Sequence, residues 1–192
     1  KLINILDNSI CLEGLANHRG SALGSFDTPQ PTPINFENTL ACEYLQIADN
    51  TVYFEDESRT IGRLVIPENF YKKMSSSKIV LVEEPIENRI QNIYEEYVKN
   101  DKDGKTSNIQ SDQLRLKLSR ISKRLGGDNY KKVDILIKSA FDNNDKKIHF
   151  EWIEILLTNY YDKMYDYQLE KKIDRCEYSG TWISVKKYLI SR

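Results

Sequence analysis

Short hydrophobic runs that end in acidic residues recur along the first half of the chain. The runs at 9–12, 51–54 and 78–82 are each followed directly by Glu. Runs of this length that are rich in Ile, Val and aromatic residues are typical of parallel strands, which are buried on both faces and carry polar groups at their carboxyl ends. The pattern predicts strands near 9–13, 51–56 and 78–83, with a fourth near 174–178.

Between these runs, the apolar residues follow a helical period. Apolar residues recur at spacings of three and four in the segments 36–47 and 86–97, and Pro85 stands where a first helical turn tolerates proline. Further on, one apolar helical face leads to a stop signal at Gly126. This face consists of Leu114, Leu118, Ile121 and Leu125. Further helices are expected at 130–141, 148–160 and 182–190.

The alternation of strands and helices indicates the fold class. It favours right-handed β-α-β crossovers and a mostly parallel sheet covered on both faces, so the class is α/β. A polar connection at 99–105 separates this pattern from a purely helical one. We therefore expect a core at 1–100, a helical insertion at 101–165, and a strand and helix at 166–192 that return to the core.

The composition is that of an ordinary soluble protein. The 192 residues, 40% of them hydrophobic, suffice for one sizeable core. No run approaches the roughly 18 consecutive apolar residues of a membrane helix, and the first residues lack the zones of a signal peptide. We therefore expect a cytoplasmic location. Cys11, Cys42 and Cys176 form no C-x-x-C pair, so neither a disulfide framework nor a zinc site is indicated.

The beginning of the chain is unusual for a domain. It starts with Lys1 rather than Met, and residues 2–6 already have the apolar density of a buried helix. We therefore expect the sequence to be a piece of a longer protein, truncated before or within the first helix of its fold.

Charge is distributed unevenly along the chain. The segment 101–150 contains 12 Lys and Arg against 7 Asp and Glu, whereas 1–100 contains 9 against 15. Within the basic segment, Lys117, Arg120 and Arg124 follow helical spacing beside the apolar stripe. Such a row of cations suits a nucleic-acid backbone, so these three are candidate nucleic-acid-binding residues. A merely solvated helix face has the same pattern.

The loop 14–25 combines glycines with a cation and an imidazole directly after a predicted strand. Glycine permits close approach of a backbone, Arg19 can bind phosphate through two parallel hydrogen bonds, and His18 can donate or transfer a proton. An ordinary structural loop with a solvated arginine has the same composition.

The acids at 55–57 stand where a hydrophobic strand ends. A hard cation such as Mg²⁺ prefers oxygen ligands and bridges phosphate oxygens, so Asp56, or else Glu55, is the candidate metal ligand. The alternative is that these acids cap the next helix or pair with Arg59 and Arg63. Because ligands bind beyond the carboxyl ends of parallel strands, we expect the loop 14–25 and the two acids to border one pocket.

Several ordered motifs together resemble the tRNA 2-selenouridine synthase family. They extend over nearly the whole chain. The segments that carry the resemblance are 12–21, 30–31, 36–38, 55–63, 66–67, 120–127 and 156–168. The family pattern differs at Lys163, where its usual residue is proline.

The resemblance implies a larger enzyme. Members of the family have a rhodanese-like domain with a catalytic cysteine, followed by a P-loop NTPase-like domain. The resemblance implies that the glycine-rich phosphate loop of this second domain would precede Lys1. They attach a geranyl group from geranyl diphosphate to 2-thiouridine at the tRNA wobble position, and then replace the sulfur with selenium from selenophosphate. Mg²⁺ is compatible with this chemistry, and nucleotide binding is left open. This piece alone is expected to be inactive.

The resemblance and the residue chemistry nominate one set of site residues. The catalytic candidates are His18, Arg19, Glu55, Asp56 and Arg59. The candidates for binding phosphate are Glu13, Gly20 and Ser21. Two other functions fit the sequence: a tRNA-binding module without chemistry of its own, in which the tyrosines at 160–167 stack on bases, and a P-loop small-molecule kinase. Neither a membrane partner nor an oligomeric state is indicated.

Overall fold

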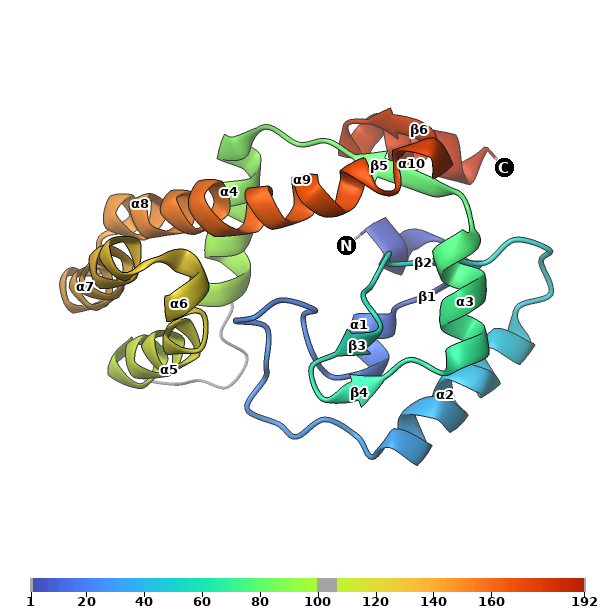
Figure 1. The fold of residues 1–192 in the computed structure, drawn as a ribbon, viewed down its shortest axis with the longest axis horizontal. Helices are drawn as coiled ribbons and strands as arrows, with labels where there is room; N and C mark the ends of the chain where they lie inside the picture. The colour runs from blue at the N-terminus through green and yellow to red at the C-terminus, as the bar shows by residue number, and fades with distance from the viewer. Residues whose placement is uncertain (1, 100–106, 192) are drawn as a thin grey trace. The chain divides into compact units, whose positions relative to one another are not determined.

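The computed structural model describes residues 2–99 and 107–191 and contains two compact units. Residues Lys1–Glu83 and Arg175–Arg192 form the first, here called the sheet unit, and Glu84–Asp174 form the helical unit (Figure 1). The division falls at Glu84 and Asp174, outside the predicted insertion limits of 101 and 165. Of the polar connection predicted at 99–105, residues 100–105 lie outside the described residues.

Two parallel strand pairs and one hairpin make up the β-structure of the described residues, and all lie in the sheet unit. Strand β1 (Ser9–Ile10) pairs in parallel with β2 (Tyr53–Phe54), and β5 (Ile79–Val82) pairs in parallel with β6 (Cys176–Gly180). Strands β3 (Thr60–Ile61) and β4 (Leu64–Val65) are antiparallel (Figure 1). The α/β class with mostly parallel pairing is confirmed.

The expected union of four strands in one sheet is not found in the described residues. The predicted strands do pair in parallel, but as β1 with β2 and as β5 with β6. A cavity lined by residues of both β2 and β5 separates the two pairs. The first run is also shorter than predicted, because Cys11 becomes the N-cap of a short helix and ends β1 at Ile10.

Capping residues set the helix boundaries of the sheet unit. The Thr32 side chain accepts a hydrogen bond from Asn35 N–H at the start of α2 (Pro33–Gln46), and Thr181 does the same for Ser184 in α10 (Trp182–Ile190). Pro33 occupies the first turn of α2, where its missing N–H costs nothing. The other helical elements are η1 (Leu2–Ile5), α1 (Leu12–Leu15), α3 (Glu68–Ser76) and η4 (Ile173–Arg175), the last of which spans the boundary between the units.

One hydrophobic cluster holds β1, α1, α2 and the hairpin together. Its fully buried members include Leu12, Phe36 and Ile61. Phe70 of α3 packs edge-on against Phe54 with ring centroids 4.8 Å apart. This cluster fixes the position of the loop that follows β1.

The helical unit contains only helices among its described residues. They are α4 (Ile86–Tyr94), η2 (Glu95–Lys99), α5 (Ser107–Ser119), α6 (Ser122–Leu125), α7 (Gly127–Asn143), α8 (Lys146–Leu156), η3 (Leu157–Tyr161) and α9 (Asp162–Glu170). Helix α7 packs against both α5 and α8. The predicted apolar stripe is confirmed, because Leu114, Leu118, Ile121 and Leu125 are all buried.

Polar groups inside the helical unit are matched. Trp152 Nε1 donates to His149 Nδ1 over 3.0 Å, and burial lowers the pKa of His149 to about 4. Arg115 forms two hydrogen bonds of 2.8 and 2.9 Å with Asp134 on the neighbouring helix, and this partner raises the arginine pKa. None of the helices in 2–99 and 107–191 has the length and apolar character needed to cross a membrane.

Candidate functional site

Glu55 ties the end of β2 to the beginning of α1. One carboxylate oxygen accepts the backbone N–H of Leu12 over 2.8 Å, and the other lies 2.9 Å from the donating Cys11 Sγ. Both oxygens are therefore used in positioning the first turn of α1. The sequence proposed Glu55 as catalytic, and the structure places both of its carboxylate oxygens against the first turn of α1.

Gly20 brings the loop against two carboxylates. It has a φ of 70°, which favours glycine, and a Cβ at this position would lie 2.5 Å from Glu13 Oε1 and 2.6 Å from Glu57 Oε1. The loop and the strand-end acids thus come together, but through Glu57 rather than through the proposed Glu55 and Asp56. Only glycine allows both acids to approach the loop backbone so closely.

A compact turn presents Arg19 and Ser21. The Arg19 N–H donates to Gly24 O over 2.9 Å, and Gly24 N–H donates to Ser21 O over 2.9 Å. The Arg19 guanidinium lies 4.1 Å from the centroid of the Phe26 ring, which supports it from one side. The backbone of this turn is therefore fixed by its own hydrogen bonds.

His18 is a buried member of the loop. It is 9% exposed, and its Nδ1 accepts the N–H of Gly20 over 3.1 Å. In the neutral imidazole the proton consequently lies on Nε2. A Cβ on Gly62, at the tip of the β3–β4 hairpin with a φ of 60°, would lie 2.8 Å from His18 Cδ2. The hairpin thus packs directly on the imidazole.

Gln30 links the loop to the hairpin, and its role was not predicted from the sequence. Its Nε2 donates to Ala16 O over 2.9 Å and to Ile61 O over 3.0 Å, while its Oε1 accepts the Arg63 N–H over 2.8 Å. The Arg63 guanidinium donates to Gln30 O over 2.8 Å. The sequence signal for Gln30 was its place in a motif of the family resemblance. Local hydrophobic periodicity does not mark a glutamine that forms hydrogen bonds with distant backbone groups.

Arg59 is engaged at the surface by α3. It forms an ion pair with Glu68, and both side chains are largely exposed. Lys72 and then Arg59 lower the Glu68 pKa. The structure therefore places Arg59 against Glu68 of α3, whereas the alternative interpretation expected it to pair with the acids at 55–57.

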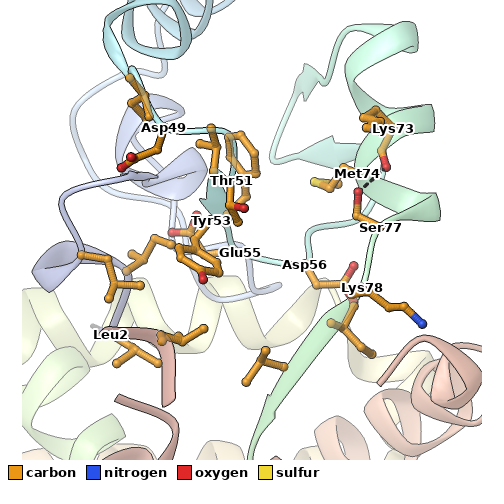
Figure 2. Close-up of a pocket in the computed structure, with 18 of the residues that line it drawn as sticks. Leu2, Asp49, Thr51, Tyr53, Glu55, Asp56, Lys73, Met74, Ser77 and Lys78 are labelled. Carbon is orange, nitrogen blue, oxygen red and sulfur yellow. Dashed lines mark hydrogen bonds between the residues drawn. The ribbon is translucent and has the colours of Figure 1, made fainter. Parts of the chain in front are cut away.

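A cavity of about 1100 Å³ opens beside the strand ends in the sheet unit. Figure 2 shows Glu55 and Asp56 after β2, with Lys78 on the β5 side of the cavity. In the described part of the chain, the loop 14–25 contributes no lining residue. The loop and the two acids therefore do not share this cavity. The cause is that the loop folds back on Glu13, Glu57 and the hairpin, whereas Asp56 faces the cavity.

The three basic candidates do not share one helix. Helix α5 ends at Ser119, so Lys117 is on α5, Arg120 is in a turn and Arg124 is on α6. The chain tightens here because Ile121 N–H donates to Leu118 O, three residues back, over 3.0 Å. Arg120 and Arg124 are exposed, while Lys117 is half-buried.

The tyrosine-rich segment has one buried and two exposed members of note. Tyr160 is 6% exposed and packs in the core, whereas Tyr165 and Tyr167 are 54% and 60% exposed. Lys171 lies 3.9 Å from the centroid of the Tyr167 ring.

Among residues 2–99 and 107–191, no group of three or more His, Cys, Asp or Glu side chains is arranged to hold a metal ion.

Comparison with known proteins agrees with the motifs. The model of the tRNA 2-selenouridine synthase AAA domain matches residues 1–192. The chain belongs to this family. The curated protein named tRNA 2-selenouridine synthase from Hydrogenovibrio crunogenus is 42% identical over 197 residues, covering 98% of this chain and 55% of that protein.

Two other relatives with the same name give a similar result. The protein from Marinobacter nauticus is 43% identical over 87% of this chain and 50% of its own length, and that from Shewanella piezotolerans is 38% identical over 95% and 54%. The chain thus spans about half the length of these family members. No solved structure matches it.

Proposed function

We propose that the chain is part of a tRNA-modifying transferase that geranylates wobble 2-thiouridine and then replaces the sulfur with selenium from selenophosphate. Membership of a family whose relatives are named tRNA 2-selenouridine synthase supports this activity. The full-length protein would carry it, with a rhodanese-like domain in the same chain and tRNA as the partner.

The loop at 18–21 is proposed to bind a phosphate group of the donor or of tRNA. The observation that carries this role is the turn closed by Arg19 and Gly24, which fixes the backbone beneath the Arg19 guanidinium. A cation held in place there would stabilise the charge that develops on diphosphate as its bond to the geranyl carbon breaks. Ser21 and the Gly20 backbone would supply neutral contacts, and His18 would shape the loop or carry a proton.

A magnesium ion is also proposed for this chemistry. The family's donors, geranyl diphosphate and selenophosphate, carry phosphate oxygens, and Mg²⁺ commonly binds through one or two carboxylates together with such oxygens and water. Asp56 faces the cavity after β2 and fits the role of a single protein ligand. Glu55 fits it less well, because both of its oxygens already accept hydrogen bonds. Glu13 and Arg59 would act around this centre by orienting the loop and the strand end.

Substitution of Arg19 in the full-length enzyme tests this assignment. Arg19→Ala is expected to lower kcat/KM for geranyl transfer by roughly 10- to 100-fold, because a charge-assisted phosphate contact is lost. Arg63→Ala serves as the control, since that guanidinium donates to the Gln30 backbone instead. Circular dichroism would verify the fold of both variants. Unchanged transfer by Arg19→Ala would remove Arg19 from the site.

A tRNA-binding module without its own chemistry is the second candidate. The exposure of Arg120, Arg124, Tyr165 and Tyr167 favours it, because cations and solvent-exposed aromatic rings are what backbone and single-strand recognition use. Geranyl transfer, tRNA affinity and ATP hydrolysis measured on the full-length protein separate the transferase, this module and a P-loop kinase.

A further inference from the structure

Two sequence motifs of the helical unit meet in the fold. Helix α6, within the motif 120–127, packs against η3, within the motif 156–168 (Figure 1). Next to this contact, Asn159 Nδ2 of η3 donates to Asn129 Oδ1 at the beginning of α7 over 3.5 Å. Two segments that carry the family resemblance, although far apart in sequence, therefore belong to one region of the helical unit.

The first of these motifs supplies positive charge. Residues 117–127 contain four Lys or Arg and no Asp or Glu. Three of the cations are exposed, namely Arg120, Lys123 and Arg124. In the second motif, the carboxylate of Asp162 accepts two hydrogen bonds from Arg89 of α4, which offsets its negative charge. The region therefore offers exposed cations that suit a chain of phosphates.

Gly127 has no reason within the helical unit to be glycine. It is the exposed first residue of α7, and its φ is not in the left-handed region, unlike the φ of 87° at Gly126. A Cβ built on Gly127 would have no atom of the described residues within 4 Å beyond its own helix and chain neighbours. Alanine would also favour the helix more than glycine does. The missing side chain points instead to an external group that approaches the backbone closely.

The second motif supplies an exposed aromatic ring. Tyr165 of α9 is 54% exposed, and its ring stacks at 25° on that of Tyr161 in η3, with the centroids 6.5 Å apart. Tyr167 is similarly exposed, but it lies roughly 200° further around the helix, and Lys171 lies over its ring. A ring held as Tyr165 is can continue a stack with an unpaired base, whereas bases within a duplex have their faces covered.

We propose that these residues form one surface, here called the motif surface, which binds the unpaired nucleotides of the tRNA anticodon loop. The motif surface consists of Arg120, Lys123, Arg124, Gly127 and Tyr165. Tyr165 stacks on a base, the cations contact the adjoining phosphates, and Gly127 allows the sugar–phosphate backbone to lie against the beginning of α7. The inference rests on the proposed function for the identity of tRNA, and it adds which part of tRNA the helical unit binds and with which residues.

RNA binding by the full-length protein, without geranyl diphosphate or selenophosphate, tests the motif surface. The two probes are the anticodon stem-loop of a substrate tRNA and a continuous RNA duplex with the same number of nucleotides. Tyr165→Ala is expected to weaken binding of the stem-loop by roughly 5- to 100-fold, because a stacked base is lost, whereas Tyr165→Phe should retain it. Tyr167→Ala is the matched control, since that ring lies on another side of α9 beneath Lys171.

Gly127→Leu blocks the motif surface without changing its charge. Because a Cβ meets no neighbour there, the variant should fold as the parent does, which circular dichroism and thermal unfolding would verify. It should weaken binding of the stem-loop at least as much as Tyr165→Ala. Ala41→Leu, exposed on α2 of the sheet unit, adds similar bulk elsewhere and should leave binding unchanged.

A preference for the stem-loop over the duplex that is lost in Tyr165→Ala and Gly127→Leu, but kept in Tyr167→Ala, supports the motif surface. Equal binding of the two probes, equal losses in both tyrosine variants, or unchanged affinity in Gly127→Leu overturns it. Geranyl transfer to the stem-loop is measured separately. Normal transfer by a parent whose binding none of these variants alters contradicts the motif surface alone, whereas absent transfer with the expected losses of binding contradicts the transferase proposal alone.

Discussion

The two units differ in how completely each satisfies its own apolar surface. In the helical unit, the inward residues of neighbouring helices, such as Leu118, Val133 and Ile153, are fully buried against one another. In the sheet unit, one cluster around Leu12 is closed, but β5 remains half-exposed beside a cavity. Helices satisfy most of their backbone hydrogen bonds internally, whereas a strand leaves backbone N–H and C=O groups unpaired along any edge without a neighbour. A group of helices can therefore satisfy most of its backbone hydrogen bonds by itself, whereas a pair of strands leaves backbone groups unpaired at its edges.

The packing of the helical unit should give the greatest change in stability on substitution. Ile137→Ala should lower the free energy of unfolding by about 3 kcal/mol, because a fully buried side chain leaves a cavity. Ile135→Ala, on the same helix but 66% exposed, should change it by less than about 0.5 kcal/mol. Urea unfolding followed by Trp152 fluorescence in a Trp182→Phe background measures both. Equal costs would contradict the packing described for α7.

Helices and strands also differ in how far the sequence predicts them. Residues 182–190 were predicted as a helix and form α10, and Gly126 ends α6 as expected, because period and stop signals are local. Strand positions were also found, but not how the strands assemble, since pairing depends on partners distant in sequence. At the candidate site, Arg19 was proposed from its residue type, whereas Gln30 was missed because its contacts with Ala16 and Ile61 arise only in the fold.

The second prediction uses the buried His149 to make the helical unit sensitive to acid. Its folded pKa, about 4, lies below the ordinary value of 6.5, so the unfolded chain binds the proton first as pH falls. The stability associated with the neutral imidazole is present above pH 6.5 and is lost progressively toward pH 4. Between pH 7 and 4.5 this loss should amount to about 2 kcal/mol.

His149→Gln provides the matched variant for this measurement. Glutamine can accept the Trp152 N–H but does not titrate in this range. The variant should be less stable than the parent at pH 7, because packing against Phe141 is lost, yet its stability should fall less steeply between pH 7 and 4.5. The same slope in both proteins would show that His149 is not the group responsible.

The prediction with the smallest expected effect concerns which unit contacts tRNA. Arg120 and Arg124 are exposed on the helical unit, whereas Lys72 and Lys187 are exposed on the sheet unit. If the first pair contacts phosphates, replacing both arginines with alanine in the full-length protein should weaken binding to different tRNAs alike. It should also lower the slope of log affinity against log salt by about 2, since two fewer counterions are released.

The matched control is the double variant Lys72→Ala with Lys187→Ala, which removes the same charge from the other unit. A general loss of positive field would weaken binding similarly in both variants, because long-range attraction depends mainly on net charge. Direct contact predicts a change of slope for the arginine pair alone.

Adding Lys117→Ala to the arginine variant should then change little, because that side chain is half-buried on α5. Titrations at four or more salt concentrations distinguish these results. An unaltered slope with unaltered affinity would identify Arg120 and Arg124 as solvated surface residues.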